Sequence, residues 1–362
     1  MPYPPRFVSD APEPGFPAGL EREPLARYLA DHLLGSHPRT LTARLIAGGR
    51  SNLTYEIDAD GRRWVLRRPP LGHVLPTAHD MAREYRVLRA LCGTEVPVPR
   101  PLALCEDPDV IGAPFYVMEW VEGVVLRDPG ALAALGTDGA RRCSEELVRV
   151  LVAIHDVDID AVGLSGFGRP VGYLERQLRR WSEQWERSKT RDLPEIDELA
   201  RRLRAALPTS PAPTVVHGDY RLDNVMVAPE DPGRIVAVLD WEMSTLGDPL
   251  ADLGLFLLYW GQADAQRIAT GAALAPTPGL YSRDEIVEAY ARRTGRDVSH
   301  LDWYLVFAAF KLAIIVEGIH ARFRMGKTVG EGFEAMGAMV TGLVTGALAT
   351  AEQSPIPALR GR

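Results

Sequence analysis

Residues 214–242 read T-V-V-H-G-D-Y-R-L-D-N-V-M-V-A-P-E-D-P-G-R-I-V-A-V-L-D-W-E, a strand-rich segment between helical patterns. Its β-branched runs at 225–228 and 234–239 are joined by P-E-D-P-G, which predicts a hairpin. Asn224 enters the hairpin and Asp240 leaves it, so strand pairing brings both side chains to the same open end. Amide and carboxylate oxygens suit Mg²⁺, which one or two protein groups and substrate phosphates usually hold. The hairpin therefore predicts a magnesium site at Asn224 and Asp240.

Asp219 lies on the same loop, five residues before Asn224. It is near the predicted metal but not forced onto the hairpin, so it can face an acceptor hydroxyl as a base. An alternative is that His217, Asp219, Asp223 and Asn224 only form a polar turn, because Gly, Asp and Asn favour loops.

Upstream, R-L-I-A-G-G-R-S-N-L-T-Y-E-I and R-R-W-V-L-R-R predict two strands that flank a turn at residues 58–61. Gly48-Gly49-Arg50-Ser51-Asn52 can bring backbone N–H groups close to phosphate oxygens, although paired glycines also mark ordinary turns. In the second strand Val65 and Arg67 share one face and Arg68 has the other. One guanidinium can therefore point inward at a polyphosphate.

A helix is predicted from about Thr77 to Leu91, where Met81, Glu84, Leu88 and Leu91 recur at spacings of three and four. This spacing places Glu84 on the inward face. A buried carboxylate needs a partner, and the strand arginine is the nearest suitable cation. The alternative is a Glu84 that reaches solvent past the helix edge.

The order of the elements predicts an α+β fold with two lobes. Residues 1–20 form a flexible N-terminal arm, 21–121 a small strand-rich lobe that ends at F-Y-V-M-E-W-V, and 122–362 a larger helical lobe that holds the hairpin. Helical segments are predicted near 140–155, 171–189, 195–206, 249–262, 283–294, 301–323 and 330–350.

Composition narrows the function classes. A net charge of −7 argues against a nucleic-acid partner, because phosphate neutralisation needs a basic face. Three scattered cysteines suggest a reducing compartment. The N-terminus has no apolar signal core, and the apolar stretch 304–316 is short and contains Lys311, which indicates a buried helix without a membrane partner. A cytoplasmic location is expected.

H-G-D-Y-R-L-D-N, V-L-D-W-E and G-D-P-L-A-D-L, in this order, resemble the aminoglycoside phosphotransferase family of the protein-kinase-like superfamily. V-L-R-R-P-P and Y-L-E-R-Q-L-R-R-W-S-E-Q-W-E are similar to the kinase-like domain attached to some acyl-CoA dehydrogenases. The resemblance covers roughly residues 40–320. It implies a bilobal fold with a small antiparallel-sheet N-lobe, a mainly helical C-lobe, and phosphate transfer from ATP to a small-molecule hydroxyl.

The resemblance also implies roles for single residues. Asp219 is the expected base, His217 braces its loop, and Asn224 and Asp240 hold Mg²⁺ on the ATP phosphates. Arg67 stands where the family has the lysine that pairs with Glu84, with Arg68 as the fallback, and Asp252 helps to hold the loop. The expected nucleotide contacts, including the backbone of the connector near the adenine, are Gly49, Ser51, Asn52, Arg67, Glu84, Glu119 and Val121.

The acceptor pocket is expected in the helical lobe, near Trp181, Trp185, Trp241, Glu242 and Tyr259, although helically spaced aromatics can equally be core. No acidic cluster suited to an aminoglycoside is evident beyond Glu242, so a less charged alcohol or a hydroxyacyl thioester is as consistent as an antibiotic. Two alternatives stay open: a catalytically idle kinase-like binding protein, and a metal-dependent hydrolase that uses Asp219 and Asp240. The sequence does not predict an oligomeric state.

Overall fold

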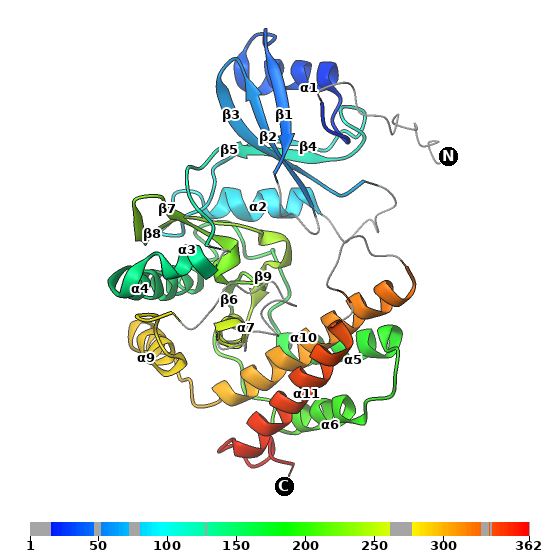
Figure 1. Ribbon diagram of the computed structural model, residues 1–362, viewed down its shortest axis with the longest axis vertical. Coiled ribbons are helices and arrows are strands. Elements are labelled where there is room, and N and C mark those ends of the chain that lie inside the picture. Colours follow the sequence, from blue (N-terminus) through cyan, green and yellow to red (C-terminus); the bar gives the residue numbers. More distant parts are fainter. Residues whose placement is uncertain are drawn as a thin grey trace. The chain divides into compact units, whose positions relative to one another are not determined.

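The computed structural model describes residues 16–46, 52–71, 80–126, 129–260, 277–326, 333 and 335–361. The chain divides into two compact units, Met1–Glu122 and Gly123–Arg362. Figure 1 labels their helices and strands. The division falls one residue after the boundary that the sequence predicts.

The first unit is built on an antiparallel sheet of five strands in the order β1-β2-β3-β5-β4. Helix α1 and a short π-helix precede the sheet, and α2 connects β3 to β4. The bounds are α1 Arg22–Leu29, π-helix Ala30–Leu34, β1 Leu41–Leu45, β2 Leu53–Ala59, β3 Arg62–Arg68, α2 Met81–Leu91, β4 Pro101–Cys105 and β5 Phe115–Glu119.

The turn predicted at residues 58–61 is present. Ala59 pairs with Arg62, and the two residues between them, Asp60 and Gly61, have φ of 51° and 80°. A two-residue hairpin turn with both residues at positive φ is the form that an Asp-Gly pair favours.

Three strands of this sheet, β1, β2 and β4, differ from the prediction. The single strand expected over residues 44–57 is two strands, β1 and β2, which pair with each other. The prediction also missed β4, which begins at Pro101. A proline is tolerated there because β4 is the edge of the sheet. The proline-rich stretch before it resembles a loop in the sequence.

The predicted flexible arm over residues 1–20 is wrong for its last five residues, and residues 1–15 lie outside the described part. Phe16 and Leu20 are 3% and 6% exposed and belong to the core between α1 and the sheet. The Tyr55 hydroxyl also donates to the Ala18 carbonyl over 2.7 Å. The high proline content concealed two apolar side chains, spaced four residues apart, that the core buries.

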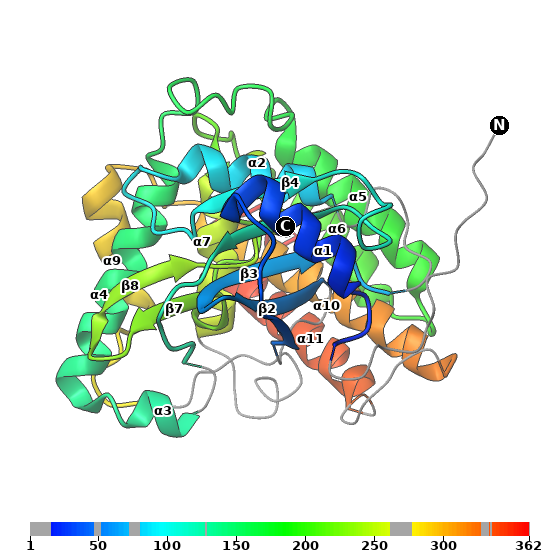
Figure 2. The same ribbon diagram turned by 90° about the horizontal axis from the view of Figure 1, so that it is seen from above.

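The second unit is mainly helical, and each predicted helical segment corresponds to a helix. Two strand pairs interrupt the helices, and α4 lies alongside the β7–β8 hairpin (Figure 2). The helices are α3 Pro129–Ala133, α4 Gly136–His155, α5 Tyr173–Ser188, α6 Pro194–Ala205, α7 Pro249–Trp260, α9 Arg283–Thr294, α10 Leu301–Arg324 and α11 Met336–Gln353. The strand pairs are β6 Thr214–Val216 with β9 Thr245–Gly247, and β7 Val225–Ala228 with β8 Asp231–Val238.

Helix α10 is long and apolar enough to cross a membrane by length and composition alone. However, 72% of its most apolar window is buried inside the protein, where α10 packs against α7 and α11. At Gly254 of α7 the two helices approach so closely that a Cβ would lie 2.8 Å from the Tyr304 carbonyl oxygen. These contacts are those of a core helix, as the sequence predicts.

Candidate active site

The loop after β6 carries the predicted base, and its path depends on Gly218. This residue has a φ of +85°, and a Cβ on it would lie 2.7 Å from the Met243 carbonyl oxygen. Glycine tolerates both the positive φ and the close approach. Gly218 therefore lets the loop pass directly against the segment that follows Asp240.

Asp252, in the first turn of α7, holds the same loop in place through hydrogen bonds. Its two carboxylate oxygens accept the N–H groups of His217 and Gly218 over 2.5 and 2.7 Å. Burial alone raises the pKa of Asp252, but the hydrogen bond and charge of His155, the charge of His217 and the Gly218 N–H outweigh it and lower the pKa. The predicted support of the loop by Asp252 is confirmed.

His217 is buried and both of its ring nitrogens have partners. The Asp219 N–H donates to Nδ1 over 3.2 Å, so Nε2 must carry the proton that is donated to the Leu239 carbonyl over 2.9 Å. The imidazole also packs against Trp241, with ring centroids 4.7 Å apart. The predicted bracing contacts are present, and they make His217 a positioning residue without a free nitrogen for proton transfer.

Asp219 is held in place but remains accessible, with 29% of its side chain exposed. The Asn224 side-chain amide donates to both its carbonyl and Oδ2, each over 2.9 Å. Arg221 Nε lies 3.6 Å from Oδ2. The Tyr259 hydroxyl also forms a hydrogen bond with Asp219. Burial, followed by the charge of Asp219, raises the pKa of this phenol, so Tyr259 stays protonated and acts as the donor. Asp219 is therefore an oriented carboxylate that can receive a proton.

The predicted meeting of Asn224 and Asp240 is confirmed in the backbone. Val225 pairs with Val238, and Leu239 N–H donates to the Asn224 carbonyl over 2.8 Å. Asp240 follows with φ 64° and ψ 63°, a left-handed conformation that aspartate tolerates and that is concentrated at functional sites.

The donor set at this end of the hairpin fits a magnesium ion. The Asn224 Nδ2 donates to Asp219, which leaves its Oδ1 as the side-chain oxygen that could serve as a ligand, and Asp240 supplies a carboxylate at the same end of the hairpin. No group of three or more His, Cys, Asp or Glu suited to a metal occurs within the described ranges. Two oxygen donors without a full protein cage match an ion that keeps waters and phosphate oxygens.

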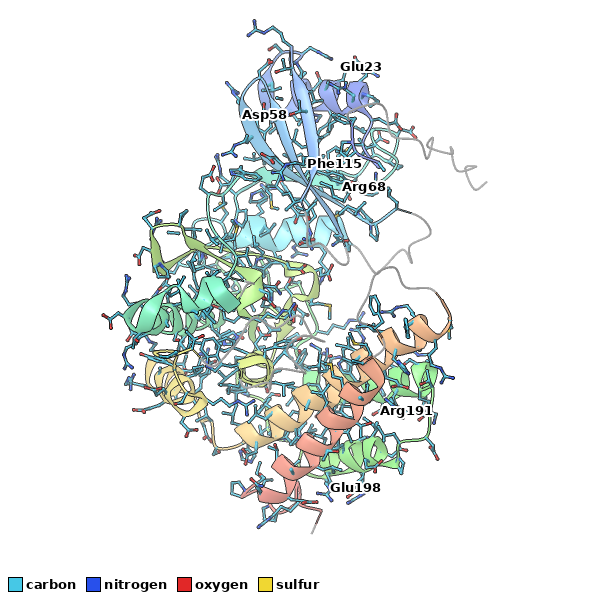
Figure 3. All side chains as sticks on the ribbon, in the orientation of Figure 1. Glu23, Asp58, Arg68, Phe115, Arg191 and Glu198 are labelled. Carbon is cyan, nitrogen blue, oxygen red and sulfur yellow. The ribbon has the colours of Figure 1, made fainter. Side chains whose placement is uncertain are left out.

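In the first unit the predicted ion pair between β3 and α2 is present. Arg67 Nε lies 3.1 Å from the Glu84 carboxylate, and the two side chains are 11% and 2% exposed. A Glu84 that reaches solvent is therefore ruled out. Arg68, labelled in Figure 3, is wrong as the fallback because its guanidinium donates to the carbonyls of Gly19 and Ile111 within the first unit.

The other predicted nucleotide contacts are only partly described. Gly49 and Ser51 lie outside the described residues, and Asn52, which directly precedes β2, is buried. At the end of β5, the Glu119 N–H donates to the Arg100 carbonyl over 2.9 Å. Val121 follows in a half-buried segment without regular structure.

The predicted acceptor contacts separate into two groups. Trp241 and Trp185 are core residues, 1% and 2% exposed, and the Trp241 indole donates to the Val238 carbonyl over 3.0 Å. Their assignment to the pocket is therefore wrong, because both rings are enclosed by packing. Tyr259 instead contacts Asp219 on the catalytic loop, and the Trp181 ring lies against Lys311, which contacts the same loop. Glu242 is half-buried, two residues after Asp240.

Sequence reasoning missed Lys311 and Arg221. Lys311 Nζ donates to the Gly218 carbonyl over 3.1 Å, and Arg221 lies over the Tyr259 ring at 5.0 Å while pairing with Asp223 at 3.5 Å. A lysine in the middle of an apolar helix was the available signal, because lysine is almost never buried without a reason. The prediction used Lys311 only as an argument against a membrane span.

Comparison with known proteins identifies relatives of this chain by sequence. Acyl-CoA dehydrogenase family member 11 of Rattus norvegicus is 37% identical over 316 residues, which cover 85% of this chain and 40% of that protein. Family member 10 of Mus musculus is 36% identical over 312 residues, 85% of this chain and 29% of that protein. The chain thus spans two fifths or less of the length of these relatives.

Solved structures agree in fold. A crystal structure of a candidate aminoglycoside phosphotransferase from Ralstonia eutropha JMP134 is 35% identical, with a TM-score of 0.81 over 92% of this chain and 99% of that one. A thermostable mutant of aminoglycoside phosphotransferase APH(4)-Ia, solved with ADP and hygromycin B, is 16% identical and has a TM-score of 0.58 over 89% of this chain and 98% of that one. At this identity the second match shows the fold alone.

The family model described as the phosphotransferase enzyme family, abbreviated APH, matches residues 42–286, from β1 through the catalytic loop to the start of α9. The resemblance inferred from the motifs is therefore confirmed, and the chain belongs to the aminoglycoside phosphotransferase family, with a protein-kinase-like fold.

Proposed function

We propose that this chain is an ATP- and Mg²⁺-dependent kinase that transfers the γ-phosphate to a hydroxyl group of a small molecule. The observation that carries the proposal is the accessible Asp219 carboxylate, which Asn224 orients on a loop fixed by Asp252. A nucleotide-dependent phosphotransferase is what family membership favours.

In the proposed reaction the acceptor oxygen forms a bond to the γ-phosphorus while the bond to the bridging oxygen of ADP breaks. The proton of the acceptor hydroxyl passes to Asp219. Asn224 and Tyr259 fix the orientation of this carboxylate, which lowers the entropic cost of aligning base and hydroxyl. Such general-base assistance contributes typically about 10²- to 10⁴-fold to the rate.

Asn224 and Asp240 are the residues that would hold magnesium. When bound, the ion neutralises phosphate charge and orients the phosphate chain. In the first unit, Glu84 holds the Arg67 guanidinium, a fork-shaped donor suited to phosphate oxygens. This arginine is a departure from the lysine expected in the family.

Two variants test the proposal, both chosen to preserve the backbone. Asp219→Asn keeps the side-chain size, and Asp240→Asn keeps a residue that tolerates the left-handed conformation. We expect acceptor-dependent ADP release, measured with Mg-ATP and a panel of alcohols, to fall at least about 100-fold in each variant. Thermal unfolding should change little.

The alternatives give different results in the same assay. An idle kinase-like fold predicts no acceptor-dependent ADP release in the parent protein. A metal-dependent hydrolase predicts release of inorganic phosphate that does not depend on any alcohol. Either result contradicts the proposed kinase.

A further inference from the structure

Lys311 projects from the middle of α10 to the catalytic loop. Its ammonium donates to the carbonyl of Gly218, the residue before Asp219, over 3.1 Å and lies over the Trp181 ring at 5.7 Å. Burial lowers the pKa of Lys311, and the charges of Asp219 and Asp252 offset this only in part. The fold therefore maintains a partly buried cation directly beside the proposed base.

Within the part of the chain that the structure describes, Lys311 forms no ion pair at 4.0 Å or less, and the charges of Asp219 and Asp252 act on it from a greater distance. Charged groups in protein interiors are normally paired, because an uncompensated buried charge is costly. An ammonium has three N–H donors, and the Gly218 carbonyl uses one of them. The remaining donors are available to a ligand next to the loop that carries Asp219.

A second donor lies beside Lys311. The Trp181 side chain is 7% exposed, and its indole N–H is buried without a hydrogen-bond acceptor among the described residues. Buried polar groups in native proteins are nearly always satisfied, so an exception indicates a missing partner. The exposed Arg180 guanidinium also lies 5.7 Å from the Trp181 ring and adds positive charge.

We propose that the acceptor alcohol carries an oxyanionic group, a carboxylate or a phosphate, which binds the Lys311 ammonium and receives a second hydrogen bond from the Trp181 indole. This inference rests on the proposed kinase function and specifies the acceptor class. A polycationic acceptor is disfavoured, because Lys311 and Arg180 repel it.

Matched acceptor pairs test the inference. One arm compares hydroxyalkanoates of four to eight carbons with their carboxamides, and the other compares glycerol 3-phosphate with glycerol. For each pair, kcat/KM for the acceptor and KM for Mg-ATP are measured in the parent protein, in Lys311→Met and in Trp181→Phe, which keeps the ring and removes the N–H. The arm with the larger preference for the charged member identifies the anion.

We expect Lys311→Met to lower kcat/KM for the charged acceptors about 100-fold, through the acceptor KM, a loss at least about tenfold larger than the loss for the neutral acceptors, which reports the contact with Gly218 alone. Trp181→Phe should cause a smaller loss in the same direction. The KM for Mg-ATP should not change. Equal losses for charged and neutral acceptors, or a preference of the parent protein for the neutral members, would overturn the inference.

Calorimetric binding of the same acceptors without ATP separates this inference from the proposed function. Charged members that bind through Lys311 but are never phosphorylated would contradict the kinase and support the anion site. Neutral members that bind equally well and are phosphorylated would support the kinase and overturn the anion site. The absence of binding by both members of every pair would also overturn it.

Discussion

Asp252 is the residue on which the geometry of the catalytic loop most directly depends. Both of its oxygens accept backbone N–H groups, from His217 and Gly218, and the side chain is 2% exposed. Asparagine has the same shape but only one acceptor oxygen, so its amide nitrogen would face a donor. An Asp252→Asn substitution therefore separates the effect of side-chain shape from the effects of charge and of the number of acceptor oxygens.

We expect Asp252→Asn to lower the free energy of unfolding by about 2–4 kcal/mol, because a buried N–H loses its acceptor. The pKa of Asp252 is lowered from 3.8, so its stabilising contribution is present above about pH 3.8 and is lost as the pH falls through the folded-state value. Thermal unfolding between pH 3 and 7 should therefore show a shallower acid limb in the variant. The exposed Asp138→Asn is the control, and an equal effect at both positions would contradict the role of Asp252.

Replacing Lys311 is expected to stabilise the protein, whereas replacing Asp252 is expected to destabilise it. Burial lowers the pKa of Lys311 in the folded protein, so the unfolded chain binds the proton more tightly. The free energy of unfolding therefore rises as the pH increases from the pKa of the folded state toward 10.5, the pKa of the unfolded state. Lys311→Met should raise the free energy of unfolding at pH 7 by about 1–2 kcal/mol, and this gain should shrink at pH 10. Thermal unfolding at the two pH values tests this, with the surface Lys189→Met as control. Destabilisation at pH 7 would indicate a structural role for Lys311.

At the scale of elements, strand β3 and helix α2 are connected by the ion pair of Arg67 and Glu84. Both side chains are buried, so removing one of them takes a charge-assisted contact away from the other in an environment that water screens poorly. The pair is therefore a sensitive test of how the first unit is held together.

We expect Arg67→Met to lower the free energy of unfolding by about 3–5 kcal/mol, and the double change Arg67→Met with Glu84→Leu to restore most of the loss. Arg89→Met, on the exposed face of α2, should change it by less than about 0.5 kcal/mol. Equilibrium denaturation of these three variants and of Glu84→Leu alone provides the measurement. Additive losses in the double variant would show that the two side chains are not coupled.

The features predictable from sequence were those with local or periodic signals. The hairpin of β7 and β8 follows from its β-branched runs, and the inward position of Glu84 follows from the helical spacing around it. Short strands carried little signal: β9 was missed, and so was β4 behind its prolines. The contact of Lys311 with Gly218 joins residues that are 93 positions apart, so no local pattern could indicate it.

At the scale of the whole molecule, the chain covers only part of its longer relatives but nearly all of the related structure from Ralstonia eutropha JMP134. Its fold and family are therefore determined, whereas its acceptor depends on side chains around the catalytic loop. Trp241 illustrates the limit of the motif: it follows a predicted metal ligand, yet its ring packs beneath His217. A position next to the motif does not by itself place a residue in the acceptor pocket.

Detection of the phosphorylated product distinguishes phosphate transfer to an alcohol from hydrolysis of ATP. Mass spectrometry of a reaction with Mg-ATP and the acceptor pairs should find a phosphate monoester of the alcohol, formed in proportion to ADP and lost in Asp219→Asn. ADP accompanied only by inorganic phosphate, or a product that persists in Asp219→Asn, would contradict transfer to an alcohol with Asp219 as the base.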